Sequence, residues 1–160
     1  MAYGDSIDKQ RGIAREPFVA QRILDYFKSM GMDVKMERAS ILEDMHKKFD
    51  YKYTCDENQS FVKTEKITEI KVDIKCGKTF TLYDDLGRNT LDNSESTCIV
   101  YELFEGDGLW WINTEKFKEC IERNKPELRK SKINNSKYFF IKDYLQDNKE
   151  FLSKFVKYIK

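Results

Sequence analysis

The chain has 160 residues, enough for one domain with a hydrophobic core and too few for two domains of ordinary size. Hydrophobic residues make up 40% and aromatic residues 14%, which argues against global disorder. The 29 basic and 28 acidic side chains nearly cancel, so the chain as a whole has no positive field that attracts nucleic acid. An anionic partner would therefore have to meet a local basic patch.

The sequence also predicts the cellular location of the protein and argues against a zinc site. It has no run of 18 or more apolar residues and no apolar stretch near its start, so we expect a soluble protein without a membrane partner, in the cytoplasm of a bacterial or infected host cell. The Lys- and Asn-rich tail suggests an AT-rich genome, viral or from a low-GC bacterium. Four cysteines without a CxxC pair and a single histidine, His46, predict free thiols rather than a zinc site.

The first third of the chain predicts a helix followed by strands. Residues 1–12 are polar and expected to be loose. From Arg15 to Gly31, apolar residues recur at helical spacing, with a proline suited to the first turn and a glycine suited to the end. A short strand is expected over residues 33–39. Residues 46–55 alternate between apolar and polar side chains, as a half-buried strand does.

The middle of the chain predicts more strands. Residues 67–76 place three β-branched residues on one face, opposite Glu69, Lys71, Asp73 and Lys75. A further strand is expected over residues 77–85, then a loop. The nearly continuous apolar run 97–104 predicts a strand covered on both faces, and “EGDG” predicts a tight turn into the strand 109–113.

The last part predicts a helix over residues 115–124, capped by Thr114, then a basic connector and a short strand over 138–141. An amphipathic helix is expected over residues 142–160. The alternation of helices and strands predicts a single α/β domain over residues 1–160, with a mixed central sheet flanked by helices.

Two acidic side chains on neighbouring predicted strands are candidate metal ligands. Asp50 and Glu69 both lie on polar strand faces, and if the strands pair, their carboxylates can point into one space. Two such charges about 4 Å apart repel by roughly 4 kcal/mol at an effective dielectric near 20, and a divalent cation removes this penalty. Lys71 projects on the same side as Glu69, and Glu16 can supply a third carboxylate. The alternative is a charged strand face that is only solvated.

These residues carry a family resemblance. The order of “RE” in the first helix, “KFD” at a strand, and “EIK” followed by “VD” resembles the PD-(D/E)xK nuclease superfamily, whose restriction-endonuclease-like and Holliday-junction-resolvase-like proteins include small phage and bacterial members. In that family the Asp heads the second core strand and Glu-x-Lys lies on the third. The residue before Asp50 is Phe49, where the family motif has proline. The resemblance extends over about residues 12–123.

The resemblance implies a restriction-endonuclease-like core and a Mg²⁺- or Mn²⁺-dependent endonuclease that hydrolyses DNA. By analogy with family members that cut two strands as dimers, it also implies a homodimer. Asp50 and Glu69 would hold the metal, Lys71 would serve the attacking water, and Glu16 would assist. A second match to the motif lies two residues further along, with Asp73 and Lys75 as the alternative pair. Two residues along a strand span about 6.6 Å, so only one pair can lie opposite Asp50. The first pair is preferred because “EIKVD” resembles the common Glu-x-Lys-x-Asp form.

A separate basic stretch is a candidate nucleic-acid contact, with a solvated loop as the alternative. Its candidate residues are Lys125, Arg129, Lys130 and Lys132. Two other functions remain open at this point. One is a catalytically silent nucleic-acid-binding module of the same fold, and the other is a structural or assembly protein whose charged sheet face is only solvated.

Overall fold

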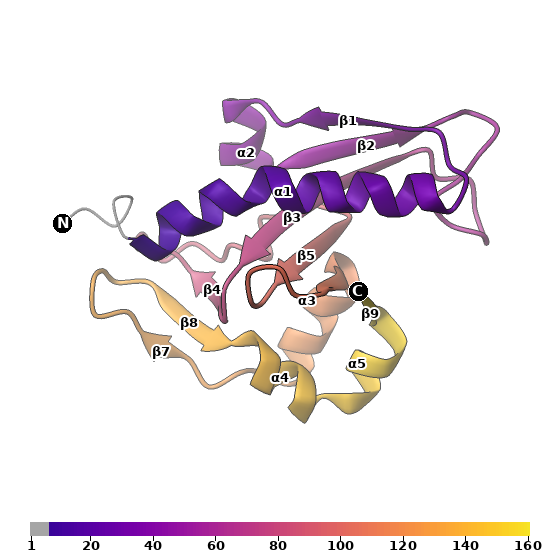
Figure 1. Cartoon of the computed structure of the whole chain (residues 1–160). Helices are drawn as coiled ribbons and strands as arrows, with labels where there is room; N and C mark the ends of the chain where they lie inside the picture. The colour runs from indigo at the N-terminus through magenta and orange to yellow at the C-terminus, as the bar shows by residue number, and fades with distance from the viewer. Residues whose placement is uncertain (1–6) are drawn as a thin grey trace.

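The protein is a mixed α/β structure with two sheets and five helices in the part that the structure describes (Figure 1). This computed structural model describes residues 7–160, with side chains from residue 14 onward. The larger sheet has six strands in the order β1-β2-β3-β5-β6-β9, and the smaller has three in the order β4-β8-β7. The strands are β1 (Val34–Arg38), β2 (Tyr51–Cys55), β3 (Glu69–Cys76), β4 (Thr79–Tyr83), β5 (Cys98–Glu102), β6 (Leu109–Asn113), β7 (Arg129–Lys130), β8 (Lys137–Phe140) and β9 (Val156–Ile159). The helices are α1 (Ile7–Ser29), α2 (Ile41–Lys47), α3 (Thr114–Arg123), α4 (Ile141–Asp147) and α5 (Lys149–Phe155).

The directions of the strands make the larger sheet mixed. β1, β2 and β3 pair antiparallel in chain order, and β5 then lies parallel to β3. β6 pairs antiparallel with β5 as the predicted hairpin, and β9 adds at the edge. The predicted α/β class with a mixed central sheet is therefore confirmed.

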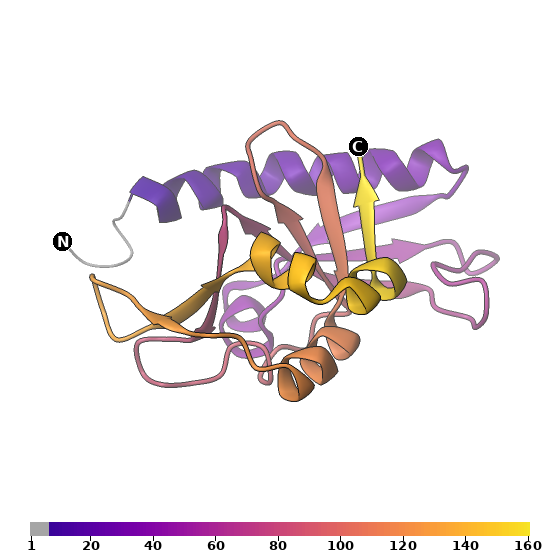
Figure 2. The ribbon, with the colours of Figure 1, turned by 90° about the horizontal axis from the view of Figure 1, so that it is seen from below.

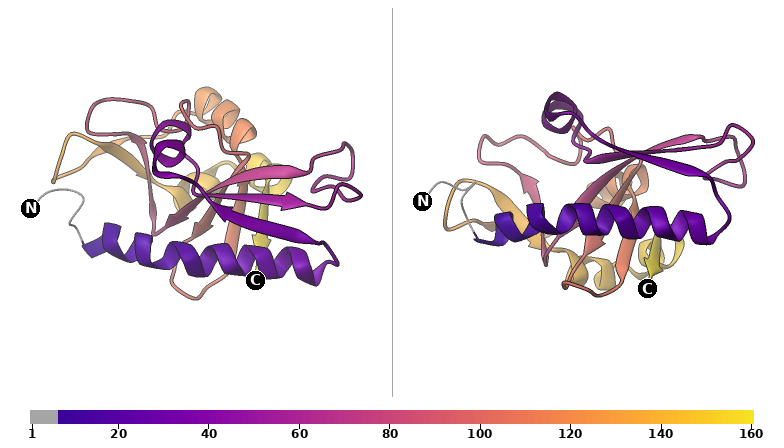
Figure 3. Two further views of the ribbon diagram at one scale, coloured as in Figure 1. Left: turned by 90° about the horizontal axis from the view of Figure 1, so that it is seen from above. Right: turned by 45° about the horizontal axis from the view of Figure 1, so that its top comes forward.

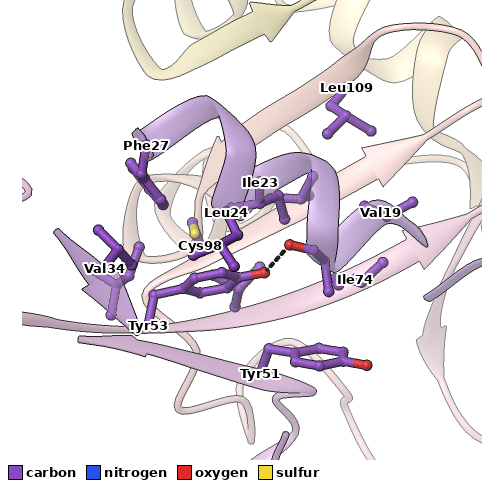
Figure 4. Close-up of a cluster of buried hydrophobic side chains, with 14 of the residues drawn as sticks. Val19, Ile23, Leu24, Phe27, Val34, Tyr51, Tyr53, Ile74, Cys98 and Leu109 are labelled. Carbon is purple, nitrogen blue, oxygen red and sulfur yellow. Dashed lines mark hydrogen bonds between the residues drawn. The ribbon is translucent and has the colours of Figure 1, made fainter. Parts of the chain in front are cut away.

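Helix α1 covers one face of the larger sheet, as Figures 1 and 3 show. Its apolar stripe, which includes Val19, Ile23 and Phe27, is buried against the apolar face of β3. The hydroxyl of the fully buried Tyr53 donates a 2.8 Å hydrogen bond to the carbonyl of Ala20, which joins helix to sheet (Figure 4). The sequence predicted both elements because their apolar residues follow helical and strand periods.

The start of α1 differs from the prediction. The helix begins at Ile7, so Pro17 lies inside it and not in its first turn. Residues 7–12, expected to be loose, are helical, and residues 1–6 lie outside the described part of the chain. A proline inside a helix removes one backbone hydrogen bond, and the burial of the following turns against the sheet offsets that loss.

The other face of the sheet is covered by the second half of the chain. A second core there combines β4, β5, β6 and β8 with α3, α4 and α5, and its large side chains include Phe80, Phe117 and Phe139. The cap of α3 is the side chain of Asn113, which accepts from the backbone N–H of Lys116 at 2.9 Å, rather than the predicted Thr114.

The C-terminal region is not the single helix predicted over residues 142–160. It forms α4 and α5, which meet at Asn148, and ends in the edge strand β9. Val156 and Ile159 pair with β6, and Ile159 is buried. Residues 156–159 therefore form a strand despite their helical periodicity, because pairing with the free edge of β6 satisfies the backbone groups of both strands.

Helix α2 was not predicted, although its start carries a recognisable signal. Ser40 and Glu43 form a capping box in which each side chain accepts from the backbone N–H of the other. Lys48 follows at φ 58°, in the left-handed region, and turns the chain into β2. The four cysteines are free, as predicted. None of the helices described here has a segment long and apolar enough to cross a membrane.

Candidate active site

Four acidic side chains from different parts of the chain meet in one pocket of about 410 Å³. Glu16 comes from α1, Asp44 from α2, Asp50 from the residue before β2, and Asp73 and Lys75 from β3. The structure thus brings together two candidates of the preferred set, Asp50 and Glu16, with the alternative pair Asp73 and Lys75.

The register between β2 and β3 decides which motif pair lies beside Asp50. The backbone N–H of Asp50 donates to the carbonyl of Val72 at 2.9 Å. Its carboxylate Oδ2 accepts from the backbone N–H of Ile74 at 2.7 Å. Asp50 is only 9% exposed, and this bond satisfies one oxygen of a carboxyl that is otherwise costly to bury. Asp50 is therefore fixed next to Asp73.

Glu69 and Lys71 lie elsewhere on the same strand. Glu69 is exposed and pairs with Thr54, near the far end of β2 from Asp50. Four residues of strand separate Glu69 from Asp73, which is roughly 13 Å. The preferred pair is thus corrected to Asp73 and Lys75 as the residues beside Asp50. The reason is that a 13-residue connection between β2 and β3 leaves their register unspecified by turn geometry.

Lys71 has a different environment from the one predicted. Its ammonium group lies 5.4 Å from the centroid of the Phe49 ring, and its Cα partner in β2 is Lys52. Lys75, in contrast, lies in the acidic pocket, with its Nζ 3.5 Å from Oδ2 of Asp73. The lysine closest to the carboxylates is therefore Lys75.

Burial and the charges of neighbouring acids raise the pKa of three carboxyls of the pocket, those of Glu16, Asp44 and Asp50. Burial, and then the charges of Asp73 and Glu16, raise the pKa of Asp50 from its ordinary 3.8 to about 9. Burial, and then the charges of Asp44 and Asp73, raise the pKa of Glu16 to about 7. The carboxyls of Asp50 and Asp73 are close enough for the charge of Asp73 to contribute to the raised pKa of Asp50. The pocket therefore has an excess of negative charge when its acids ionise.

Burial alone lowers the pKa of a lysine, but the pKa of Lys75 is raised. The charge of Asp73 raises it and outweighs burial, with Asp50 and Glu16 adding to the rise. Lys75 is therefore protonated at neutral pH and acts as a fixed positive charge at the wall of the pocket.

No family model, curated protein or solved structure that was compared with the chain matches it.

Three charged residues of the pocket were not predicted from the sequence, namely Arg38, Asp44 and Lys48. Arg38 ends β1, and the other two belong to α2 and its C-terminal cap (Figure 3). Local desolvation and then the charge of Asp73 raise the pKa of Asp44, which shows that it feels the same acidic cluster. The Ser-x-x-Glu capping box at Ser40 was the signal in the sequence that would have revealed α2.

The remaining candidates lie away from the pocket. Arg129 and Lys130 form the short strand β7 and are exposed, while Lys125 lies in the connection before it and Lys132 after it. Lys125 and Arg129 line a separate hollow of about 510 Å³ next to α4. His46 is exposed on α2.

The acidic pocket is not a closed metal-binding cage. Among the side chains that the structure describes, no group of three or more His, Cys, Asp or Glu residues is arranged to hold one metal ion. The pocket instead combines oxygen donors, one lysine and two further cationic residues at its rim. This combination suits an anionic ligand that brings a hard cation and its waters.

Proposed function

We propose that the protein is a metal-dependent nuclease that hydrolyses phosphodiester bonds in DNA, built on a restriction-endonuclease-like core. The observation that carries this proposal is the convergence of Asp50, Asp73, Lys75 and Glu16 in one pocket. Carboxylates, a lysine and a third acid in a recess are the groups that metal-assisted phosphodiester hydrolysis requires.

The order of elements supports the same proposal. Asp50 immediately precedes β2, the second strand of the larger sheet, and the Asp-x-Lys pair of Asp73 and Lys75 lies on β3, the third. Helix α1 precedes the sheet in the chain and contributes Glu16. This arrangement agrees with the PD-(D/E)xK resemblance, with “DIK” taking the role first given to “EIK”.

The donors suit Mg²⁺ or Mn²⁺. Magnesium usually keeps several waters and takes only one or two protein carboxylates, so it does not need a set of three protein ligands. Asp50 and Asp73 would hold the ion, since they are adjacent and their repulsion raises the pKa of Asp50. When bound, the cation supplies neutralisation of phosphate charge and a more acidic water.

The protein's own groups then have separable roles. Lys75 is protonated, so it donates to the phosphate and stabilises developing negative charge instead of taking a proton. Glu16, with a pKa of about 7, is suited to accept a proton from water near neutral pH. Arg38 and Lys48 line the same pocket and contact neighbouring phosphates.

The test is a cleavage assay on junction, flap, duplex, nicked and single-stranded DNA with Mg²⁺ or Mn²⁺. We expect cleavage of at least one form, and none in excess chelator. Absence of cleavage on all forms with both metals would refute the nuclease proposal.

A further inference from the structure

The outward side of the small sheet carries aromatic rings. Along β8, Phe139 is buried in the second core, whereas Tyr138 and Phe140 lie on the opposite side and are only half-buried. Arg129 of β7 pairs with Tyr138, and its guanidinium lies 5.0 Å from the centroid of the Phe140 ring. A solvent-facing sheet surface normally carries polar side chains, so aromatic rings there point to a ligand.

A third ring and two lysines extend this surface. Phe104, in the turn between β5 and β6, is 48% exposed. Phe104 and Phe140 line a hollow of about 170 Å³ together with Lys78 and Lys142. The Lys78 ammonium lies 5.2 Å from the centroid of the Phe104 ring. Exposed rings flanked by cations can stack on nucleobases while the cations contact phosphates.

The segment that contains β7 and β8 is strongly basic, although the chain as a whole is nearly neutral. Residues 123–143 contain seven basic side chains and two acidic ones, of which Asp143 lines the hollow, against a net charge of +1 for the whole chain. This segment includes β7 and β8, which reach out on the side of the molecule where the described part of α1 begins (Figures 1 and 2). The local field therefore complements a polyanion.

The aromatic surface adjoins the acidic pocket. Phe104 and Phe140 also line a larger hollow of about 550 Å³ that includes Arg15 and Cys76. The next residue of α1 after Arg15 is Glu16, and the residue of β3 before Cys76 is Lys75, and both of these line the acidic pocket. The two hollows are therefore lined by neighbouring residues of the same helix and the same strand.

We propose that this surface binds a single strand of nucleic acid by base stacking. We call it the stacking surface, and it consists of Lys78, Phe104, Arg129, Tyr138, Phe140 and Lys142. A duplex covers the faces of its bases by its own stacking, so rings that stack on bases select unpaired nucleotides. The consequence for the substrate, which rests on the proposed function, is that the DNA cut in the acidic pocket carries a single-stranded segment.

The test measures binding separately from cleavage. Fluorescence anisotropy in excess chelator compares a fluorescein-labelled 20-nucleotide single strand with a duplex of the same length. We expect tighter binding of the single strand, with affinity that falls as salt rises. Phe104→Leu keeps an apolar side chain but removes the ring, and it should weaken single-strand binding about tenfold with little change for the duplex. Tyr158→Leu, which removes an exposed ring on β9, should leave both affinities unchanged.

The outcomes separate this inference from the nuclease proposal. Equal binding of single strand and duplex, or unchanged single-strand binding in both Phe104→Leu and Lys142→Glu, would overturn the stacking surface. If polyglutamate displaced the labelled single strand as well as unlabelled DNA does, and Phe104→Leu had no effect, the surface would be a general polyanion site. This result would also overturn the stacking surface. If single-strand binding depended on Phe104 but no DNA was cleaved with either Mg²⁺ or Mn²⁺, the stacking surface would be supported and the nuclease proposal refuted. Phe104 is largely exposed, so thermal unfolding should confirm that Phe104→Leu is folded.

Discussion

Replacing Asp50 by asparagine should stabilise the metal-free protein. The pKa of Asp50 rises from 3.8 to about 9 because the carboxyl is buried beside Asp73 and Glu16, so at pH 7 folding must take up a proton. Each pH unit between the unfolded pKa and pH 7 costs about 1.4 kcal/mol, which sets an upper limit of about 4 kcal/mol for this site. The amide of Asp50→Asn needs no proton, and its oxygen can still accept from the N–H of Ile74.

The sign of the pH dependence follows from the raised pKa. The contribution of Asp50 to wild-type stability is fully present below about pH 4 and is lost as the pH rises toward about 9, so the advantage of Asp50→Asn should grow over this range. At pH 7 a gain of this size corresponds to a rise in melting temperature of roughly 10 °C. The assay is thermal unfolding by circular dichroism from pH 4 to 8 in chelator. Asp92→Asn is the matched control, because Asp92 is exposed and should show no gain.

Added Mn²⁺ provides the second half of this test. The ion should raise the melting temperature of the wild type and not that of Asp50→Asn, because binding to the folded state alone stabilises it. The reasoning would be refuted if Asp50→Asn were less stable than the wild type at pH 7 in chelator, or if the difference between the two did not change with pH.

Three further predictions concern single side chains. Lys75→Met should lower the rate of metal-dependent cleavage by about 100-fold, because it removes the positive charge beside Asp73; a rate within twofold of wild type would exclude that role. The apparent affinity for Mn²⁺, measured by titration calorimetry, should fall as the pH drops below about 9, because the ion must displace the proton of Asp50, and an affinity that does not change between about pH 6 and 8 would exclude Asp50 as a ligand. Tyr53→Phe should lose about 1 kcal/mol in urea unfolding, since it removes the hydrogen bond to Ala20; no loss would mean that water replaces that bond.

The sequence predicted the parts of the fold that local periodicity determines. The strand containing Glu69 and Asp73 follows from strict alternation, and the hairpin of β5 and β6 follows from its turn residues. The register of β3 against β2 could not be predicted in the same way. Both motif pairs lie on one face of β3, and only the pairing with β2 decides which pair lies beside Asp50. That pairing is set by packing of the whole sheet against α1, which the alternation does not encode.

Long-range pairing also explains the errors at the chain ends. The segment that forms α5 and β9 has apolar residues that suit a helix, yet Val156 and Ile159 complete the edge of β6. Asp44 joins the pocket through α2, a helix with no buried residue, so hydrophobic periodicity gave no sign of it. Asp50 was predicted as a site residue from its place on a polar strand face, Glu16 was considered as a third carboxylate, and the family resemblance supported both.

The most direct test of the central claim is the initial rate of Mn²⁺-dependent DNA cleavage in two matched variants. Asp73→Asn and Glu69→Gln each neutralise one acid on the same face of β3, but only Asp73 lines the pocket with Asp50. We predict a loss of about 100-fold or more for Asp73→Asn and a rate within about twofold of wild type for Glu69→Gln. The reverse ranking, or full activity in both variants, would contradict the assignment of catalysis to Asp50, Asp73 and Lys75.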